Sequence, residues 1–100
     1  MNLYAAHYAY DDRLEERNAI RDDHLAYLNA LVDAGSLLAY GRYADEHDPG
    51  ALFIYLAETA EAVEEMIAGD PYVSSGFVPG HDVRLWPALG PWPSQLDAQG

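Results

Sequence analysis

The sequence has no cysteine and no lysine, and only five of its 100 residues are basic. Without cysteine there is no disulfide framework, no thiolate nucleophile and no thiolate metal site, and such a composition suits a reducing cytoplasm. Five arginines stand against 17 acidic residues, which gives a formal net charge of -12. The clustered cations on which nucleic-acid binding depends are therefore lacking, and anionic membranes are disfavoured. We expect no nucleic-acid partner and no membrane partner.

Long apolar runs are lacking as well. The longest run, residues 51–57, is far shorter than the roughly 20 residues that cross a bilayer, and no basic, apolar signal segment opens the sequence. Half of the residues are nevertheless hydrophobic, and eight are tyrosines, which is a globular composition. We expect a soluble, cytoplasmic protein with one domain over residues 1–88 and a Pro-rich C-terminal tail over residues 89–100. The excess of acidic residues is explained most simply by solubility. The alternative is that the acidic surface is a docking face for a basic partner.

Hydrophobic periodicity predicts strand, helix, strand, strand, helix and strand in that order. A short helical turn is expected at residues 71–75, after the second long helix. This order is that of the split βαβ units of a ferredoxin-like α+β sandwich, βαββαβ. The expected bounds of the six main elements are residues 3–10, 13–34, 37–43, 51–57, 59–69 and 81–86.

The predicted strand at residues 51–57 is apolar at odd and even positions alike. Two helices cover only one face of a four-stranded sheet, so the second face of the sheet also needs burial. The simplest cover is the same face of a second copy. We therefore expect a homodimer in which two sheets face each other and form an α+β barrel.

One stripe of the first predicted helix holds three of the five arginines and a histidine, namely Arg13, Arg17, Arg21 and His24. Their spacings of four, four and three residues place them on one helix face. Like charges in such a row repel one another unless anionic groups face them. Either carboxylates of the protein neutralise these arginines, or an anionic ligand lies against them. For Arg21, one turn from His24, the two interpretations are balanced.

His24 shares its helix face with Ile20 and Leu28, so its ring is expected to point toward the interior or a cleft. A histidine that acts as a general base needs an acceptor that keeps one ring nitrogen protonated and leaves the other free. Asp70 is the best candidate for this acceptor. Simpler interpretations stay open: His24 can be an ordinary core residue, and Asp70 can cap the helical turn that begins at Pro71. Because a carboxylate has two oxygens, both functions of Asp70 can coexist.

The other histidines, His7, His47 and His81, lack the spacing of a metal site, and we expect neither a metal nor a cofactor. His7 and His81 are expected to approach each other as a structural contact if the outer strands of the motif are neighbours. No Gly-rich phosphate loop, nucleophile elbow or nucleotide fingerprint occurs. The helix histidine and its carboxylate are therefore the main candidates for chemistry.

Four short motifs occur in a fixed order: Arg21-x-x-His24-Leu25-x-x-Leu28, Gly35-x-Leu37 leading to Gly41, Asp70-Pro71-Tyr72-Val73 with Gly76, and Val83-x-Leu85-x-Pro87. Together they resemble the YCII-related (YciI-like) family over residues 3–88. The resemblance implies a ferredoxin-like fold that dimerises into an α+β barrel, with His24 and Asp70 as the family's proposed catalytic pair. One branch of that family is similar to a dehydrochlorinase of chlorinated hydroxyquinols, whereas most members have no known substrate. The sequence departs from the family at Gly41-Arg42, where members often have Gly-Pro, and in its tail.

These observations predict a small cofactor-independent lyase or isomerase. His24 would move a proton on a small anionic or aromatic compound, while Asp70 orients the imidazole and stabilises its charged form. The alternative is a non-catalytic ligand-binding or accessory module of the same dimeric fold, in which the two residues form only a structural hydrogen bond. The residues expected to bind the substrate are Arg21, Arg42, Tyr8, Tyr40 and Tyr72.

Overall fold

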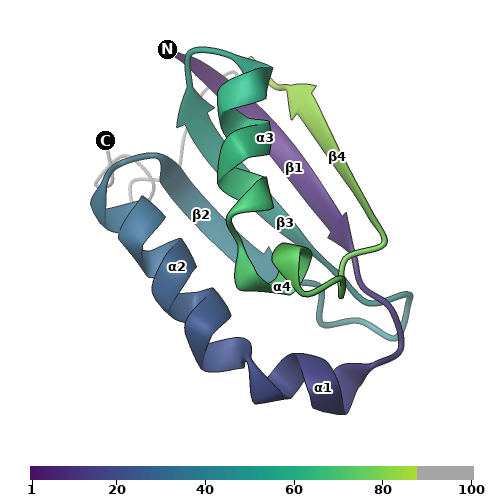
Figure 1. Cartoon of the computed structure of the whole chain (residues 1–100). Helices are drawn as coiled ribbons and strands as arrows, with labels where there is room; N and C mark the ends of the chain where they lie inside the picture. The colour runs from purple at the N-terminus through teal and green to yellow at the C-terminus, as the bar shows by residue number, and fades with distance from the viewer. Residues whose placement is uncertain (88–100) are drawn as a thin grey trace.

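The computed structural model describes residues 1–87, so the predicted tail at residues 89–100 lies outside the described part of the chain. Figure 1 shows the elements in the order β1, α1, α2, β2, β3, α3, α4, β4. No helix within residues 1–87 has both the length and the apolar character that crossing a membrane requires. The strands are β1 Asn2–Ala9, β2 Leu37–Arg42, β3 Gly50–Ala57 and β4 Gly80–Leu85, and the helices are α1 Leu14–Ala19, α2 Arg21–Asp33, α3 Ala60–Ala68 and α4 Pro71–Ser74.

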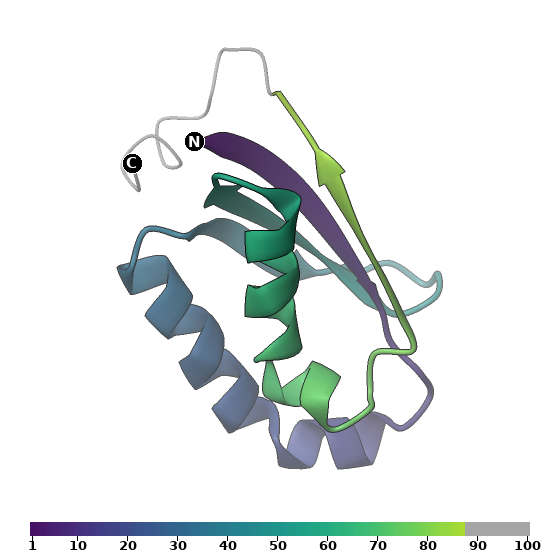
Figure 2. The ribbon, with the colours of Figure 1, turned by 45° about the horizontal axis from the view of Figure 1, so that its top comes forward.

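The four strands form one sheet in the order β2-β3-β1-β4, and every neighbouring pair is antiparallel. This order confirms the predicted α+β, ferredoxin-like arrangement. Helices α2 and α3 lie on the same face of the sheet in both views of the ribbon (Figures 1 and 2). Among the described residues, no helix covers the opposite face, which we call the open face.

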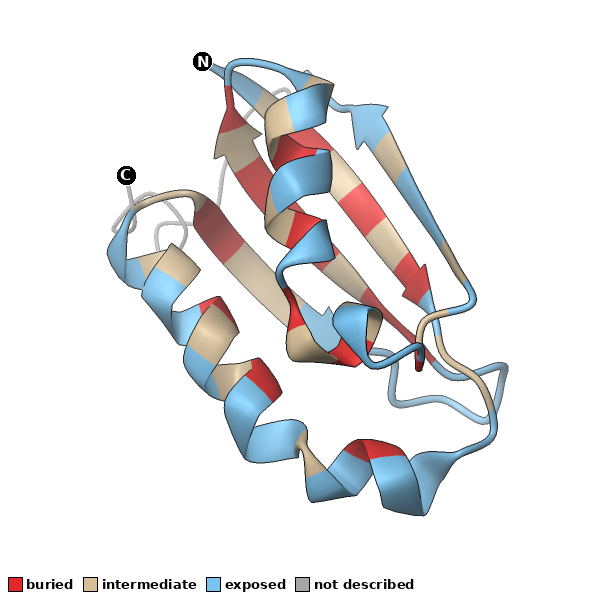
Figure 3. Cartoon of the chain, in the orientation of Figure 1, coloured by how far each residue is buried: buried red, intermediate tan, exposed pale blue. Residues whose placement is uncertain are grey.

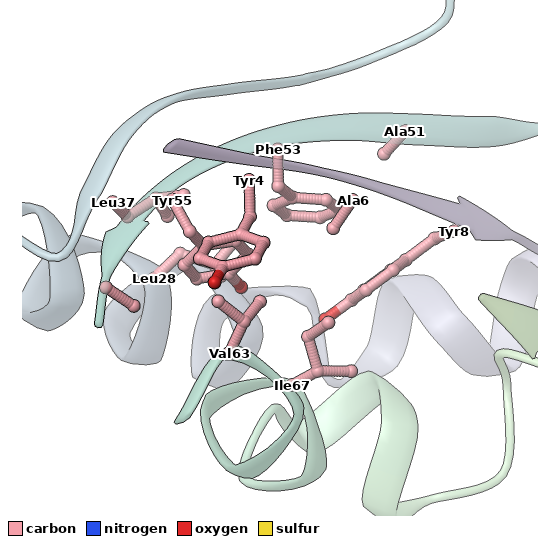
Figure 4. Packing of buried hydrophobic residues seen from close by; sticks show 11 residues of the cluster. Tyr4, Ala6, Tyr8, Leu28, Leu37, Ala51, Phe53, Tyr55, Val63 and Ile67 are labelled. Carbon is pink, nitrogen blue, oxygen red and sulfur yellow. The ribbon is translucent and has the colours of Figure 1, made fainter. Parts of the chain in front are cut away.

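Alternation along the two central strands decides which side chains enter the core. Buried and partly buried residues alternate along β1 (Figure 3), with Tyr4 and Tyr8 buried toward the helices. Figure 4 shows Phe53 and Tyr55 of β3 beside them, above Val63 of α3. The core of this domain is thus rich in tyrosine, so its hydroxyl groups also need hydrogen-bond partners.

The prediction of one continuous helix over residues 13–34 is wrong, because α1 and α2 meet at a break at Ile20. The backbone of Ile20 has φ -113° and ψ 14°, outside the α-helical region, and its N–H donates to the carbonyl of Arg17, three residues back. A β-branched residue such as isoleucine favours a helix less than an unbranched one. Arg17 belongs to α1 and donates to the Asp11 carbonyl, whereas Arg21 and His24 belong to α2, so the predicted stripe is divided between two helices.

The end of α3 positions the segment that carries Asp70. Thr59 caps the start of α3, as predicted, by accepting a hydrogen bond of 3.1 Å from the N–H of Ala62. At the other end, the Tyr27 hydroxyl of α2 donates to the Met66 carbonyl at 2.6 Å. A Cβ at Gly69 would lie only 2.5 Å from that hydroxyl oxygen. Glycine at position 69 therefore allows α2 and the end of α3 to approach closely.

Candidate active site

A cleft of about 700 Å³ lies where the start of α2 faces the adjoining ends of β2 and β3. No carboxylate side chain within residues 1–87 lines this cleft, although the sequence contains 17 acidic residues. Its walls instead carry aromatic rings and positive charge. The main side chains are His24, Arg17, Arg21, Arg42, Tyr10, Tyr40, Tyr43, Phe53 and Tyr72.

The structure brings His24 and Asp70 together across 46 positions of sequence, with Nδ1 and Oδ1 2.7 Å apart. Asp70 is fully buried, and His24 is 6 % exposed, on a ring that lines the cleft. An ionised carboxylate only accepts hydrogen bonds, so Nδ1 carries the proton and donates it. The second ring nitrogen, Nε2, makes no hydrogen bond with any described residue. A neutral His24 in this arrangement has a free lone pair at Nε2.

Asp70 is held by donors at both carboxylate oxygens. Oδ1 also accepts from the N–H of Tyr72 at 3.0 Å, which makes Asp70 the N-cap of α4. Oδ2 accepts from the Tyr8 hydroxyl at 2.7 Å. A buried carboxylate requires such compensation for its lost hydration. Both predicted functions of Asp70, the helix cap and the partner of His24, therefore occur in one geometry.

The plane of the imidazole is fixed by Tyr72. The two rings are stacked with their centroids 3.7 Å apart and an angle of 5° between their planes. Burial raises the pKa of the Tyr72 hydroxyl, while the positive charges of Arg17 and Arg21 act in the opposite direction. Tyr72 thus stays a neutral phenol at ordinary pH, and the cleft beside it carries positive potential.

Two of the predicted arginines are neutralised within the protein. Arg13 forms an ion pair of 2.6 Å with Asp11, and this contact holds the pKa of the Asp11 carboxyl below its ordinary value. Arg17 is buried, donates to the Asp11 carbonyl at 3.0 Å, and lies 4.5 Å from the centre of the Tyr10 ring. For these two arginines, partners within the protein are the correct alternative.

Arg21 and Arg42 differ from this pair. Both line the cleft and are exposed, and neither forms a hydrogen bond or ion pair with another residue of the described part. Arg21 is the first residue of α2, one turn before His24, and Arg42 is the last residue of β2. Unpartnered cations in a cleft without carboxylates are a binding site for anionic groups.

The predicted aromatic walls are divided between cleft and core. Tyr40 and Tyr72 line the cleft, and the Tyr40 hydroxyl donates to Asn29 at 2.9 Å. Tyr8 does not line it; its side chain is 2 % exposed and reaches beneath the cleft to Asp70. Burial, followed by the negative charge of Asp70, raises the pKa of Tyr8. Phe53, which the sequence reasoning missed, lies opposite Tyr40 in the β2–β3 register and could have been found from that pairing.

The expected contact between His7 and His81 does not form, although β1 and β4 are neighbours. The register places His81 opposite Tyr8, so the two histidines point to opposite faces of the sheet. His7 Nδ1 lies 2.7 Å from the Tyr43 hydroxyl, and His81 Nε2 lies 2.6 Å from Glu64. Neither His7 nor His81 lines the His24 cleft, although Tyr43, the partner of His7, does.

The antiparallel four-stranded sheet, its two covering helices and the cleft at one end define a ferredoxin-like α+β protein. The model of the YCII-related domain matches residues 1–87, and the chain belongs to this family.

The relatives named here agree with this assignment. The chain is 40% identical over 79 residues to Protein YciI of Escherichia coli O6:H1 and, with the same values, to Protein YciI of Shigella flexneri; each alignment covers 69% of this chain and 81% of the relative. Among solved structures, it is similar to 5-chloro-2-hydroxyhydroquinone dehydrochlorinase (TftG) from Burkholderia phenoliruptrix AC1100, in complex with 2,5-dihydroxybenzoquinone. That likeness has a TM-score of 0.75 at 22% identity and covers 88% of this chain and 95% of the other. It shows the fold.

Proposed function

We propose that this protein is a small lyase or isomerase in which His24 is the general base and Asp70 orients it. The observation that carries the proposal is the buried 2.7 Å contact between Nδ1 and Oδ1, on a ring that lines the cleft. A proton taken from a bound compound goes to Nε2 and makes the imidazolium. The charge of Asp70 then stabilises this cation more than it stabilised the neutral ring, which lowers the barrier to proton transfer. The same proton later returns to the product or leaves with the departing group.

The compound proposed is small, aromatic and anionic. Aromatic side chains supply flat apolar walls, and Arg21 and Arg42, which no residue of the described part neutralises, supply positive charge in a protein of net charge -12. Arg21, one turn from the base, is suited to hold an anionic oxygen next to the carbon that loses its proton. The dehydrochlorinase TftG, which shares the fold, was solved with 2,5-dihydroxybenzoquinone. Its named activity supports the lyase class, and its ligand is a suitable first probe.

We also propose that the protein is a homodimer through the open face of the sheet. Leu52 and Leu56 of β3 are only half-buried there, and Ile54 lies between them. A second copy would remove this apolar row from water, which favours association. Light scattering at micromolar concentration is expected to give twice the chain mass, and a clean monomer would contradict the two-sheet barrel.

Proton transfer can be tested directly with the probe. We expect the wild-type protein to accelerate exchange of the ring hydrogens of 2,5-dihydroxybenzoquinone with deuterium in D2O, followed by proton NMR. His24→Gln should abolish the acceleration. Asp70→Asn should reduce it by about 10²- to 10⁴-fold, because an amide that donates to Nδ1 leaves the proton on Nε2. His81→Gln, which alters a histidine that does not line the cleft, is the matched control.

The alternative is a non-catalytic ligand-binding or accessory module. One observation favours it: Asp70 also caps α4 and accepts from the Tyr8 hydroxyl, so this carboxylate has structural partners besides His24. In that case the probe binds in the cleft and protects the protein against unfolding, while its ring hydrogens exchange no faster with the wild-type protein than with His24→Gln. That result would support the binding module and contradict the enzyme.

A further inference from the structure

Arg21 and Arg42, which have no bonded partner within residues 1–87, stand on different layers of the fold. Arg21 begins α2 in the helix layer, whereas Arg42 ends β2 in the sheet layer. In the β2–β3 register Arg42 lies opposite Ala51, two positions from the pair formed by Tyr40 and Phe53, so it shares their face of the sheet, which is turned toward the helices. Helix α2 and strand β2 belong to different layers (Figure 1). The cleft is lined by Arg21 from the one and Arg42 from the other, and neither guanidinium is bonded to another residue within 1–87.

Between these two charges the lining is aromatic. The helix layer presents the stacked rings of His24 and Tyr72, and the sheet layer presents Tyr40 and Phe53, whose planes differ by 12°. Aromatic walls favour a flat, apolar middle in the ligand. The other cleft arginine, Arg17, is already engaged by Asp11 and is no competitor for an anion.

We propose that the cleft is specific for flat dianions, with one anionic group bound by Arg21 beside His24 and the second bound by Arg42. This rests on the proposed function, which by itself requires only one anionic group next to the base. Arg21 then orients the reacting end, and Arg42 is a specificity-determining residue that selects for the distant charge. A monoanion leaves one guanidinium without a partner, so it binds more weakly. The ligand class is a conjugated or aromatic dicarboxylate or dienolate.

Binding of one dianion by both Arg21 and Arg42, which we call the arginine clamp, can be tested with three dicarboxylates of increasing length. Each is compared with the analogue in which a methyl group replaces one carboxylate. The pairs are fumarate with crotonate, trans,trans-muconate with sorbate, and terephthalate with p-toluate. Titration calorimetry of the wild-type protein should give at least one dicarboxylate that binds about 10- to 100-fold more tightly than its methyl analogue, the factor expected for one further charge-assisted hydrogen bond. Added salt should reduce this ratio.

Arginine variants assign the two charges. Arg42→Gln should bring the ratio of affinities close to one, chiefly by weakening the dicarboxylate. Arg84→Gln, which changes an exposed arginine of β4 outside the cleft, should leave the ratio as it is in the wild type. Arg21→Gln should weaken both members of a pair, because it removes the group that orients the anion beside His24.

Two results would overturn the arginine clamp. Either no dicarboxylate binds more tightly than its methyl analogue, or the preference for the dicarboxylate persists in Arg42→Gln. The response of the His24 ring nitrogens to the same ligands separates this failure from failure of the proposed function. If the monoanions shift the Nε2 resonance, the base still meets an anionic ligand and only the dianion preference is wrong. If no member of any pair shifts Nε2, the proposed ligand class is wrong as well.

Discussion

Replacing Tyr8 by phenylalanine removes one hydroxyl and leaves the ring, so it isolates the hydrogen bond that holds Asp70. The donor is 2 % exposed, the acceptor is fully buried, and the distance between them is 2.7 Å. A hydrogen bond to a charged group contributes about 1.5–3 kcal/mol. In Tyr8→Phe the carboxylate oxygen Oδ2 has lost its donor and lies too deep for water to replace it. We therefore expect the free energy of unfolding to fall by about 1.5–3 kcal/mol.

Urea denaturation followed by circular dichroism, at one protein concentration and pH 7, measures this loss. The slope m should not change, because the surface exposed on unfolding is nearly the same. Tyr4→Phe is the matched control: Tyr4 lies on the same face of β1 and is buried, and its hydroxyl bonds to no described residue. If Tyr8→Phe is no less stable than Tyr4→Phe, then the Tyr8 contact does not hold the carboxylate.

Tyr8→Phe should also change how the free energy of unfolding depends on pH above about pH 10. Burial and the charge of Asp70 raise the pKa of Tyr8 in the folded state, above the value of about 10 expected in the unfolded chain. Below pH 10 both states keep the phenol proton, so this tyrosine causes no loss of stability. Above pH 10 the unfolded state loses the proton first, and stability falls by about 1.4 kcal/mol per pH unit for each such tyrosine. Tyr8→Phe should therefore reduce this slope by the contribution of one tyrosine.

Three further substitutions have expected outcomes. Tyr55→Phe should leave stability unchanged or raise it by up to about 1 kcal/mol in urea denaturation, because the buried Tyr55 hydroxyl has no hydrogen-bond partner within residues 1–87; a loss above 1 kcal/mol would contradict this. Gly69→Ala should lower stability by about 1–3 kcal/mol, because the new Cβ meets the Tyr27 hydroxyl; an unchanged urea midpoint would argue against this close approach. Arg13 lowers the folded-state pKa of Asp11, so the ionised carboxyl stabilises the fold, and this stabilisation is lost as pH falls through that pKa. Asp11→Asn should therefore make the free energy of unfolding fall less steeply with decreasing pH below about pH 4. A pH dependence identical to that of the wild type would refute this.

Much of the fold could be predicted from the sequence because its signals are local. The four strands have the predicted bounds within one residue, since alternating apolar residues and flanking turns mark them. The caps at Thr59 and Asp70 were likewise visible from residue type and position. The break at Ile20 was not visible, because a helical pattern runs through it. It accompanies a contact of Arg17 with Asp11 and Tyr10 that only the folded chain creates.

The sequence was enough to predict several residues of the candidate site, but not which of them lie next to one another. Spacing identified His24 and Asp70 but left open whether they meet. Tyr8 was expected in the cleft because tyrosine suits a binding wall; the structure places it in the core, since the face of β1 that carries it is turned toward the helices. Which arginines stay free could not be predicted, because Asp11 engages two of them through tertiary contacts.

Whether Asp70 orients His24 as a base is tested most directly by the protonation of the two His24 ring nitrogens, measured by ¹⁵N NMR of labelled protein while the ring is neutral. We predict that Nδ1 carries the proton and that Nε2 is unprotonated and shifts when the anionic probe is added. In Asp70→Asn the proton should move to Nε2. If Nε2 is protonated in the wild type, or stays insensitive to the probe and to Asp70→Asn, His24 is not a base oriented by Asp70.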